Sequence, residues 1–134
     1  MRRRVVLAAA VPMALTALLT GCSAPPGERE RVLGTARDWL AAVRAGDPAA
    51  ECRLLTPAAR QSVATGDDTC EQALGDLDLP GGGSIGAVEI WSDEAQVRTG
   101  EDTLFLVRVA GGWRVSGAGC TARRDGPYDC DVEG

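Results

Sequence analysis

The stretch Pro80-Gly81-Gly82-Gly83 divides the sequence into two parts with different periodicity. Before it, apolar residues recur at the three- and four-residue spacing of amphipathic helices; after it, they alternate or run together in short segments, as in strands. No Lys-Ser or Lys-Thr pair follows the glycines, so they predict a hinge and not a phosphate-binding loop. Helices followed by a sheet predict an α+β fold.

Four helices are expected before the glycines. The first covers residues 28–45, where these apolar side chains share one face: Val32, Ala36, Trp39, Leu40 and Val43. Each of the other three begins at a capping side chain. These starts are Asp47-Pro48, Thr56-Pro57 and the capping box of Thr69 with Gln72. The three helices are expected to end near Leu55, before Gly66 and near Leu77.

Four strands are expected after the glycines, in residues 85–91, 95–99, 103–110 and 113–117. Short turns at Ser92-Asp93, Gly100-Glu101 and Gly111-Gly112 separate them, which favours an antiparallel meander. The segment from Cys120 to Gly134 has mixed polarity, and we expect a disulfide-held loop there with at most one edge strand. The predicted architecture is thus N-terminal helices packed on a curved antiparallel sheet of about four strands.

The N-terminal segment has the layout of a secretory signal. Three arginines, Arg2 to Arg4, precede an uncharged stretch over residues 5–19, and small residues follow. The stretch is shorter than the roughly 20 apolar residues that a spanning helix needs, and it contains Pro12. Prolines and not a basic stop-transfer run follow it, so we expect the segment to be removed.

The end of this segment, Leu19-Thr20-Gly21-Cys22, resembles the bacterial lipobox. The resemblance implies that the Cys22 sulfur receives a diacylglyceryl group and that cleavage makes Cys22 the first residue. Two acyl chains (palmitate-type) hold a protein durably on a bilayer. We expect a signal peptide over 1–21, a lipidated cysteine with a Pro-rich spacer over 22–27, and a domain over 28–134. The expected location is the outer face of the cytoplasmic membrane, anchored by lipid; a plain secretory signal with a chance cysteine is the alternative.

Cleavage before Cys22 leaves 113 of the 134 residues, enough for one compact domain. It removes three of the 14 basic residues and none of the 19 acidic ones, so the remaining net charge is −8. An acidic domain without a basic patch argues against nucleic-acid binding. The chain has no histidine, the commonest general base and metal ligand, and we expect neither metal nor cofactor.

Four cysteines remain once Cys22 is assigned to lipid: Cys52, Cys70, Cys120 and Cys130. An even number in an oxidising compartment predicts two disulfides. Three pairings are possible, and we favour Cys52 with Cys70 and Cys120 with Cys130 because each closes a short loop. A four-cysteine zinc site is the alternative, but neither pair has the close spacing of such sites.

Several segments resemble small NTF2-like (cystatin-like) lipoproteins of actinobacteria. They are residues 39–47 (WLAAVRAGD), 52–57 (CRLLTP), 112–115 (GWRV), 119–120 (GC) and 127–130 (PYDC). The resemblance implies a long first helix across a curved sheet, with a cone-shaped pocket between them. Its motifs concern packing and disulfides, so it informs the fold more than the activity.

Few side chains are arranged in patterns typical of catalytic, ligand-binding or metal sites. Trp39, Trp91 and Trp113 are candidates to line a pocket, but the core of a small domain is the stronger interpretation. Asp38 and Asp47 could act as a buried base, but a polar helix face and a helix cap explain them better. The acidic tail at Asp125, Asp129, Asp131 and Glu133 lacks a calcium-loop pattern. Tyr128 is expected to pack beneath a disulfide.

The leading hypothesis is a non-enzymatic accessory module of the cell envelope that binds a small ligand or an envelope protein. The alternatives are an isomerase- or hydratase-type enzyme with a cavity carboxylate, and a structural spacer. The interior of the cone separates the three hypotheses. A carboxylate of raised pKa in an open cavity favours the enzyme, an open apolar cavity favours binding, and an interior filled by Trp39 and Trp91 favours the spacer.

Overall fold

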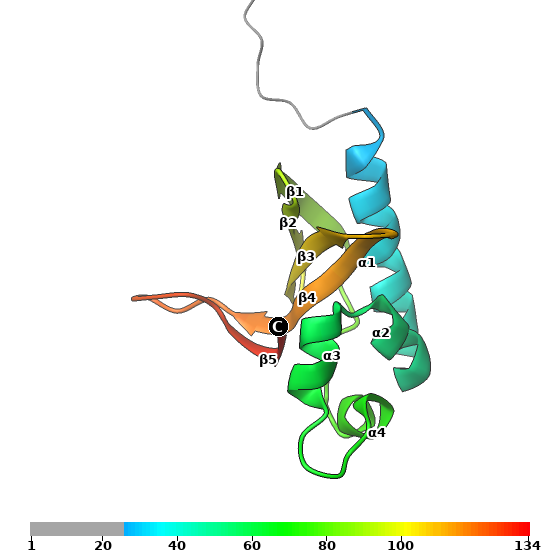
Figure 1. The fold of residues 1–134 in the computed structure, drawn as a ribbon. Coiled ribbons are helices and arrows are strands. Elements are labelled where there is room, and N and C mark those ends of the chain that lie inside the picture. Colours follow the sequence, from blue (N-terminus) through cyan, green and yellow to red (C-terminus); the bar gives the residue numbers. More distant parts are fainter. Residues whose placement is uncertain (1–25) are drawn as a thin grey trace, which may run out of the picture.

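The computed structural model describes residues 26–134 of the chain, so the predicted signal peptide, the lipobox and Cys22 lie outside the described residues. Four helices come first and five strands follow, and this segregation makes the domain an α+β fold (Figure 1). Within residues 26–134, no helix is both long and apolar enough to cross a bilayer. The helices are α1 (Glu28–Ala45), α2 (Pro48–Leu54), α3 (Pro57–Val63) and α4 (Cys70–Gly75).

The predicted capping side chains are all in place. Asp47 accepts a hydrogen bond from the Ala50 amide at 3.0 Å, and Thr56 accepts one from Ala59 at 3.0 Å. Thr69 and Gln72 form the full capping box that starts α4. These bonds satisfy amides that the first turn of a helix leaves without partners, so three short helices can begin at defined residues.

The sheet is antiparallel with the strand order β1-β2-β3-β4-β5. The strands are β1 (Ile85–Trp91), β2 (Glu94–Thr99), β3 (Thr103–Val109), β4 (Gly112–Thr121) and β5 (Asp129–Glu133). The sheet therefore has five strands, where about four were predicted. β4 continues past Gly117, and β5 pairs with its extension in the segment for which we expected at most one edge strand. The mixed polarity of this exposed hairpin hid its strand periodicity.

Both disulfides have the favoured pairing. Cys52–Cys70 joins α2 to α4, and Cys120–Cys130 joins β4 to β5. The first bond therefore ties together two short helices, and the second holds the short β5 to the end of the long β4.

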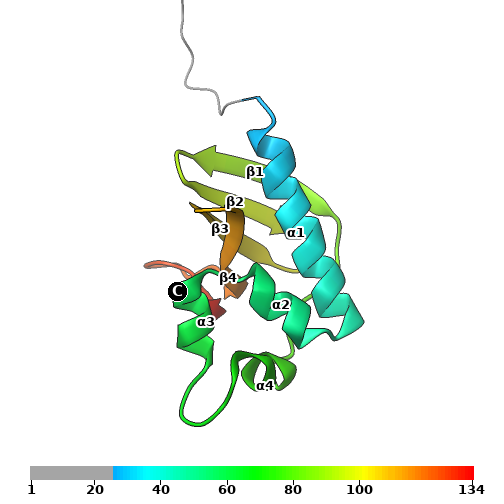
Figure 2. The same ribbon diagram turned by 45° about the vertical axis from the view of Figure 1, so that its right-hand side comes forward.

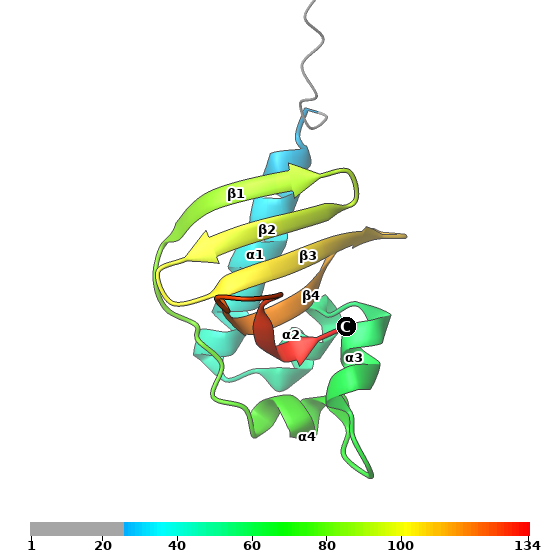
Figure 3. The ribbon, with the colours of Figure 1, turned by 90° about the vertical axis from the view of Figure 1, so that its left-hand side faces the viewer.

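The helices cover one face of the sheet, with α1 running across the strands (Figure 2). The opposite face, called the outer face below, is turned to the viewer in Figure 3 and carries no helix. The β4–β5 hairpin bends away from the sheet on this outer side (Figure 1). The core lies between helices and sheet and contains these fully buried side chains: Val32, Trp39, Leu55, Val97, Leu104, Leu106 and Val115.

The glycine hinge brings the chain from α4 to β1 in close contact with a turn of the sheet. Gly83 has φ +77°, and a Cβ there would lie 2.6 Å from the Gly100 amide nitrogen, so only glycine fits. Arg44 donates to the Gly81 carbonyl at 2.9 Å, and the Gly82 amide donates to Glu101 at 3.1 Å. The glycine segment is therefore held in place by hydrogen bonds to α1 and to the β2–β3 turn.

Candidate functional site

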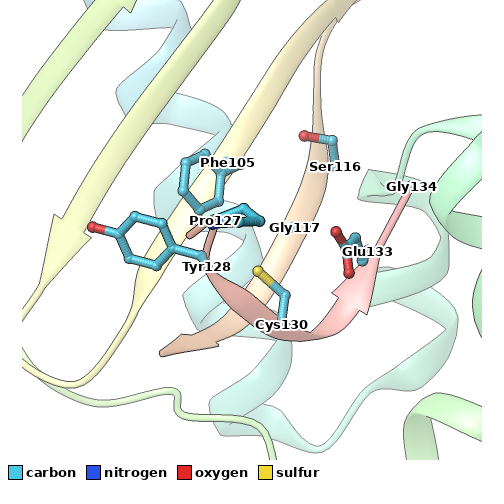
Figure 4. A pocket seen from close by; sticks show the side chains of 8 residues that line it. All are labelled: Phe105, Ser116, Gly117, Pro127, Tyr128, Cys130, Glu133 and Gly134. Atoms are coloured by element: carbon cyan, nitrogen blue, oxygen red, sulfur yellow. The ribbon is translucent and has the colours of Figure 1, made fainter. Parts of the chain in front are cut away.

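An apolar pocket opens in the angle between the outer face of the sheet and the β4–β5 hairpin (Figure 4). Its volume is about 510 Å³, which is within the range of small-molecule sites. Strands β3, β4 and β5 and the hairpin loop supply the lining residues: Phe105, Ser116, Gly117, Pro127, Tyr128, Cys130, Glu133 and Gly134. This set is called the hairpin pocket below.

Two aromatic rings form one wall of the hairpin pocket. Phe105 and Tyr128 meet edge to face, with 5.0 Å between ring centroids and an interplanar angle of 70°. Phe105 points outward because its neighbours Leu104 and Leu106 point into the core. Tyr128 comes from the hairpin loop, beside the disulfide, so the wall joins two segments 23 positions apart in the sequence.

A buried carboxylate holds the base of the hairpin. Asp102, only 6% exposed, accepts hydrogen bonds from the amides of Thr103, Gly119 and Cys120 at 2.7–2.9 Å. Burial raises the pKa of Asp102, and the three amide bonds oppose this shift only in part. Both oxygens are occupied by backbone donors, so Asp102 positions the bend in β4 that forms the hairpin pocket.

The polar groups of the hairpin pocket are few. Ser116 offers a hydroxyl and Glu133 an exposed carboxylate at the edge of the site (Figure 4). Across residues 26–134, no group of three or more His, Cys, Asp or Glu side chains is arranged to hold a metal ion. The arrangement suits an apolar or aromatic group, with a hydroxyl and a carboxylate available to orient it.

The structure does not bring the three predicted tryptophans together. Trp39 is fully buried between α1 and the sheet, and its Nε1 has no hydrogen-bond partner within the described part of the chain. Trp91, at the end of β1, is 52% exposed. Trp113 is buried in the core. None of the three lines the hairpin pocket.

Trp113 belongs to an ionic cluster around the buried Glu28 carboxylate at the start of α1. Its Nε1 donates to Glu28 at 2.6 Å, and the Arg108 and Arg31 guanidinium groups pair with the same carboxylate at 3.0 and 2.9 Å. Arg108 also lies 5.4 Å from the Trp113 ring centroid, within cation–π range. Burial by itself would raise the pKa of Glu28, but these donors and charges outweigh it and lower the pKa.

The remaining candidates have structural positions. Asp38 is exposed on α1, and Asp47 caps α2. Of the acidic tail, Asp125 and Asp129 are exposed, Asp131 faces the Gly119 backbone, and Glu133 lines the hairpin pocket.

Sequence reasoning missed Phe105 as a pocket residue, although its outward position follows from strand alternation. It also missed the burial of Glu28, Glu51 and Asp102, for which the sequence carries no signal.

No family model, curated protein or solved structure matches the chain.

Proposed function

We propose that the chain is a lipid-anchored module of the cell envelope, held by a diacylglyceryl group on Cys22 at the outer face of the cytoplasmic membrane. The support is the pattern of a basic segment, an apolar segment and Leu19-Thr20-Gly21-Cys22. The two disulfides support export, because disulfides persist in oxidising compartments and are rare in the cytosol.

We further propose that this module binds a small ligand with an apolar or aromatic group in the hairpin pocket. One observation carries the proposal: a pocket of about 510 Å³ with a Phe105–Tyr128 wall, on a sheet face that no helix covers. The apolar surface of the hairpin pocket is exposed and does not pack in the core, although a disulfide and a buried carboxylate hold the hairpin in place beside it. Exposed apolar pockets of this kind are typical of binding sites.

An NTF2-like relationship remains part of the proposal. The order of helices before strands and the long α1 across the sheet support it. In such a cone the ligand would lie between α1 and the sheet, but here Trp39 fills that interior together with Leu104 and Val115. We therefore propose the opposite side of the sheet as the binding side.

Binding is favoured over catalysis by the chemistry of the hairpin pocket. Its only carboxylate side chain, Glu133, is exposed, and the chain has no histidine. The buried carboxylate nearby, Asp102, already accepts three backbone hydrogen bonds. A general base needs an acceptor that can reach the substrate, and Asp102 offers none.

The test is a screen of aromatic and aliphatic fragments against the exported chain by two-dimensional amide NMR. We expect ligands to shift the amide signals of Phe105, Gly117 and Tyr128 together. Tyr128→Ala should weaken their binding by about tenfold, because an aromatic wall contributes roughly 1–3 kcal/mol to a bound apolar group. Arg123→Ala is the matched control, since this exposed residue of the same hairpin does not line the hairpin pocket.

Two results would contradict the proposal. One is ligand binding that is unchanged in Tyr128→Ala. The other is an absence of fragment binding, together with a photo-crosslinker at position 128 that captures nothing in intact cells. The second result would favour a structural spacer over a ligand-binding module.

A further inference from the structure

A second, smaller cavity lies on the helical side of the molecule, remote in sequence from the hairpin pocket. The end of α1, the start of α2, the end of α4 and the segment after α4 line it. Its volume is about 170 Å³. The lining residues are Val43, Gly46, Pro48, Glu51, Leu74, Gly75, Leu77, Asp78 and Leu79.

The distinctive group in this cavity is the Glu51 carboxylate. Glu51 is 5% exposed, and its Oε2 atom has no hydrogen-bond partner within residues 26–134. None of the three ion pairs found in that range includes it. Burial raises the pKa of Glu51, and the neighbouring Asp47 charge adds to the shift. An unpaired buried carboxylate is costly, so it is expected to have a partner or to take up a proton.

The surroundings of Glu51 favour a positive charge. The C-terminal end of the 18-residue α1 lies at the cavity through Val43 and Gly46, and helix C-termini carry partial negative charge. Asp78 adds a second carboxylate to the lining. Arg44, the basic residue in the last turn of α1, donates instead to the Gly81 carbonyl.

The other walls are aliphatic. Val43, Leu74 and Leu79 line the cavity, and Leu74 is almost fully buried. A volume of about 170 Å³ holds roughly five or six water-sized groups, such as a four-carbon chain with one polar end. A divalent metal fits less well, because such ions take six or more oxygen ligands and no acidic cluster of the required size is present in the described chain.

We propose that this cavity binds a short alkylammonium ion, with the ammonium group on the Glu51 carboxylate and the aliphatic part against Val43, Leu74 and Leu79. The ammonium donates to the Glu51 carboxylate and neutralises the buried charge. The site is independent of the hairpin pocket, which is proposed to bind an apolar or aromatic group on the other side of the sheet.

The experiment uses the full-length chain in detergent micelles and titrates it with n-butylammonium chloride, followed by calorimetry and amide NMR. We expect saturable binding with shifts at Gly46, Glu51 and Gly75. Glu51→Gln keeps the shape and removes the charge, so the affinity should fall at least about tenfold. Asp38→Asn, an exposed carboxylate on α1 outside the cavity, should bind as the unchanged chain does.

Neutral n-butanol and the chlorides of sodium and calcium are the comparison ligands. Weak or absent binding of all three supports an ammonium site. Equal binding of n-butanol, or shifts at the same amides with calcium alone, would overturn it. Folding is monitored separately: because Glu51→Gln removes an unpaired buried charge, its unliganded Tm should be no lower than that of the unchanged chain. Failure of n-butylammonium to bind the folded chain would show a cavity that holds only water.

Discussion

At the scale of single residues, the three buried carboxylates differ in the partners that surround them. Glu28 has donors and cations around it, Asp102 has backbone amides on both oxygens, and Glu51 has one oxygen without a partner. A charge in a protein interior is stable only when such groups replace its water. The contrast explains why the pKa of Glu28 is lowered while those of Asp102 and Glu51 are raised.

The two buried tryptophans provide a matched test of this view. Trp113 donates to Glu28, whereas the Trp39 Nε1 has no partner in the described structure. Trp39→Phe loses packing, but it also removes a buried donor without a partner, whose burial costs about 1–3 kcal/mol of stability. Trp113→Phe loses packing and a hydrogen bond to a charged group. We expect urea unfolding to show the larger loss for Trp113→Phe; equal losses would argue against the structure of the ionic cluster.

Asp102→Asn should loosen the hairpin. The amide side chain has one acceptor oxygen in place of two, so at least one of three backbone donors loses its partner, at a cost of about 1–3 kcal/mol. Thermal unfolding measures this change. Asp93→Asn is the control, because Asp93 is 69% exposed and its ion pair with Arg108 should contribute less than about 1 kcal/mol. A loss from Asp93→Asn as large as that from Asp102→Asn would contradict the assignment.

At the scale of elements, local chemistry predicted the helices well. The starts of α2, α3 and α4 were predicted from Asp47-Pro48, Thr56-Pro57 and Thr69, because caps and prolines act within one turn. β5 was expected at most as one edge strand of a disulfide-held loop, and its pairing with an extended β4 was not predicted. Its pairing depends on Cys130, on the bend at Gly119 and on Asp102, which lies in another part of the sequence.

The two disulfides should have separable effects on the elements that they join. Chain entropy assigns each about 3 kcal/mol, because the joined cysteines are 10 and 18 positions apart. We expect Cys120→Ser with Cys130→Ser to speed amide hydrogen exchange in β5 and to abolish ligand binding in the hairpin pocket. Cys52→Ser with Cys70→Ser should speed exchange in α4 and leave the hairpin pocket intact. Faster exchange in β5 from both pairs would contradict this independence.

At the scale of the whole molecule, the site was harder to predict than the fold. Composition and spacing indicated an acidic, disulfide-bonded α+β domain, but they gave no reason to place a pocket on the outer face. That pocket exists because β4 bends and carries Tyr128 over Phe105, and such a bend results from tertiary contacts. Trp39 was a candidate for the pocket but was better explained as a core residue, and its packing confirms the core position.

Stability should depend on pH with opposing contributions. Glu28 has a lowered folded pKa, so its contribution is full above its ordinary value of 4.5 and is lost as the pH falls through the folded pKa. Glu51 and Asp102 have raised pKa values in the folded state. Their contributions to the free energy of unfolding are therefore full below the ordinary values, 4.5 for Glu51 and 3.8 for Asp102, and are lost as the pH rises through the folded pKa values.

Urea unfolding from neutral pH down to about pH 3 tests this balance. We expect the free energy of unfolding to rise on first acidification toward the ordinary carboxylate range and to fall at lower pH, where Glu28 takes up a proton. Glu51→Gln should reduce the initial rise, because it removes one of the two groups responsible. An initial rise of the same size in Glu51→Gln would contradict the buried position of that carboxylate.

The proposed anchor has a direct test in growing cells. An alkyne-labelled fatty acid should be incorporated into the chain, and Cys22→Ser should abolish the label and release the protein from the membrane fraction. Cys120→Ser with Cys130→Ser is the control, because it removes cysteines that no lipid is expected to modify. Label that persists in Cys22→Ser would overturn the anchor.

The ionic cluster at Glu28 bears on how an anchored domain withstands mechanical load. A pull from the membrane would reach the domain at Gly27, one residue before Glu28. Because Glu28 is tied to Arg108 on β3 and to Trp113 on β4, and Arg29 donates to the Val88 carbonyl on β1, the force would spread into the sheet. These contacts would protect the first turn of α1 from unwinding, so a force applied at Gly27 would be carried by the sheet as well as by the helix.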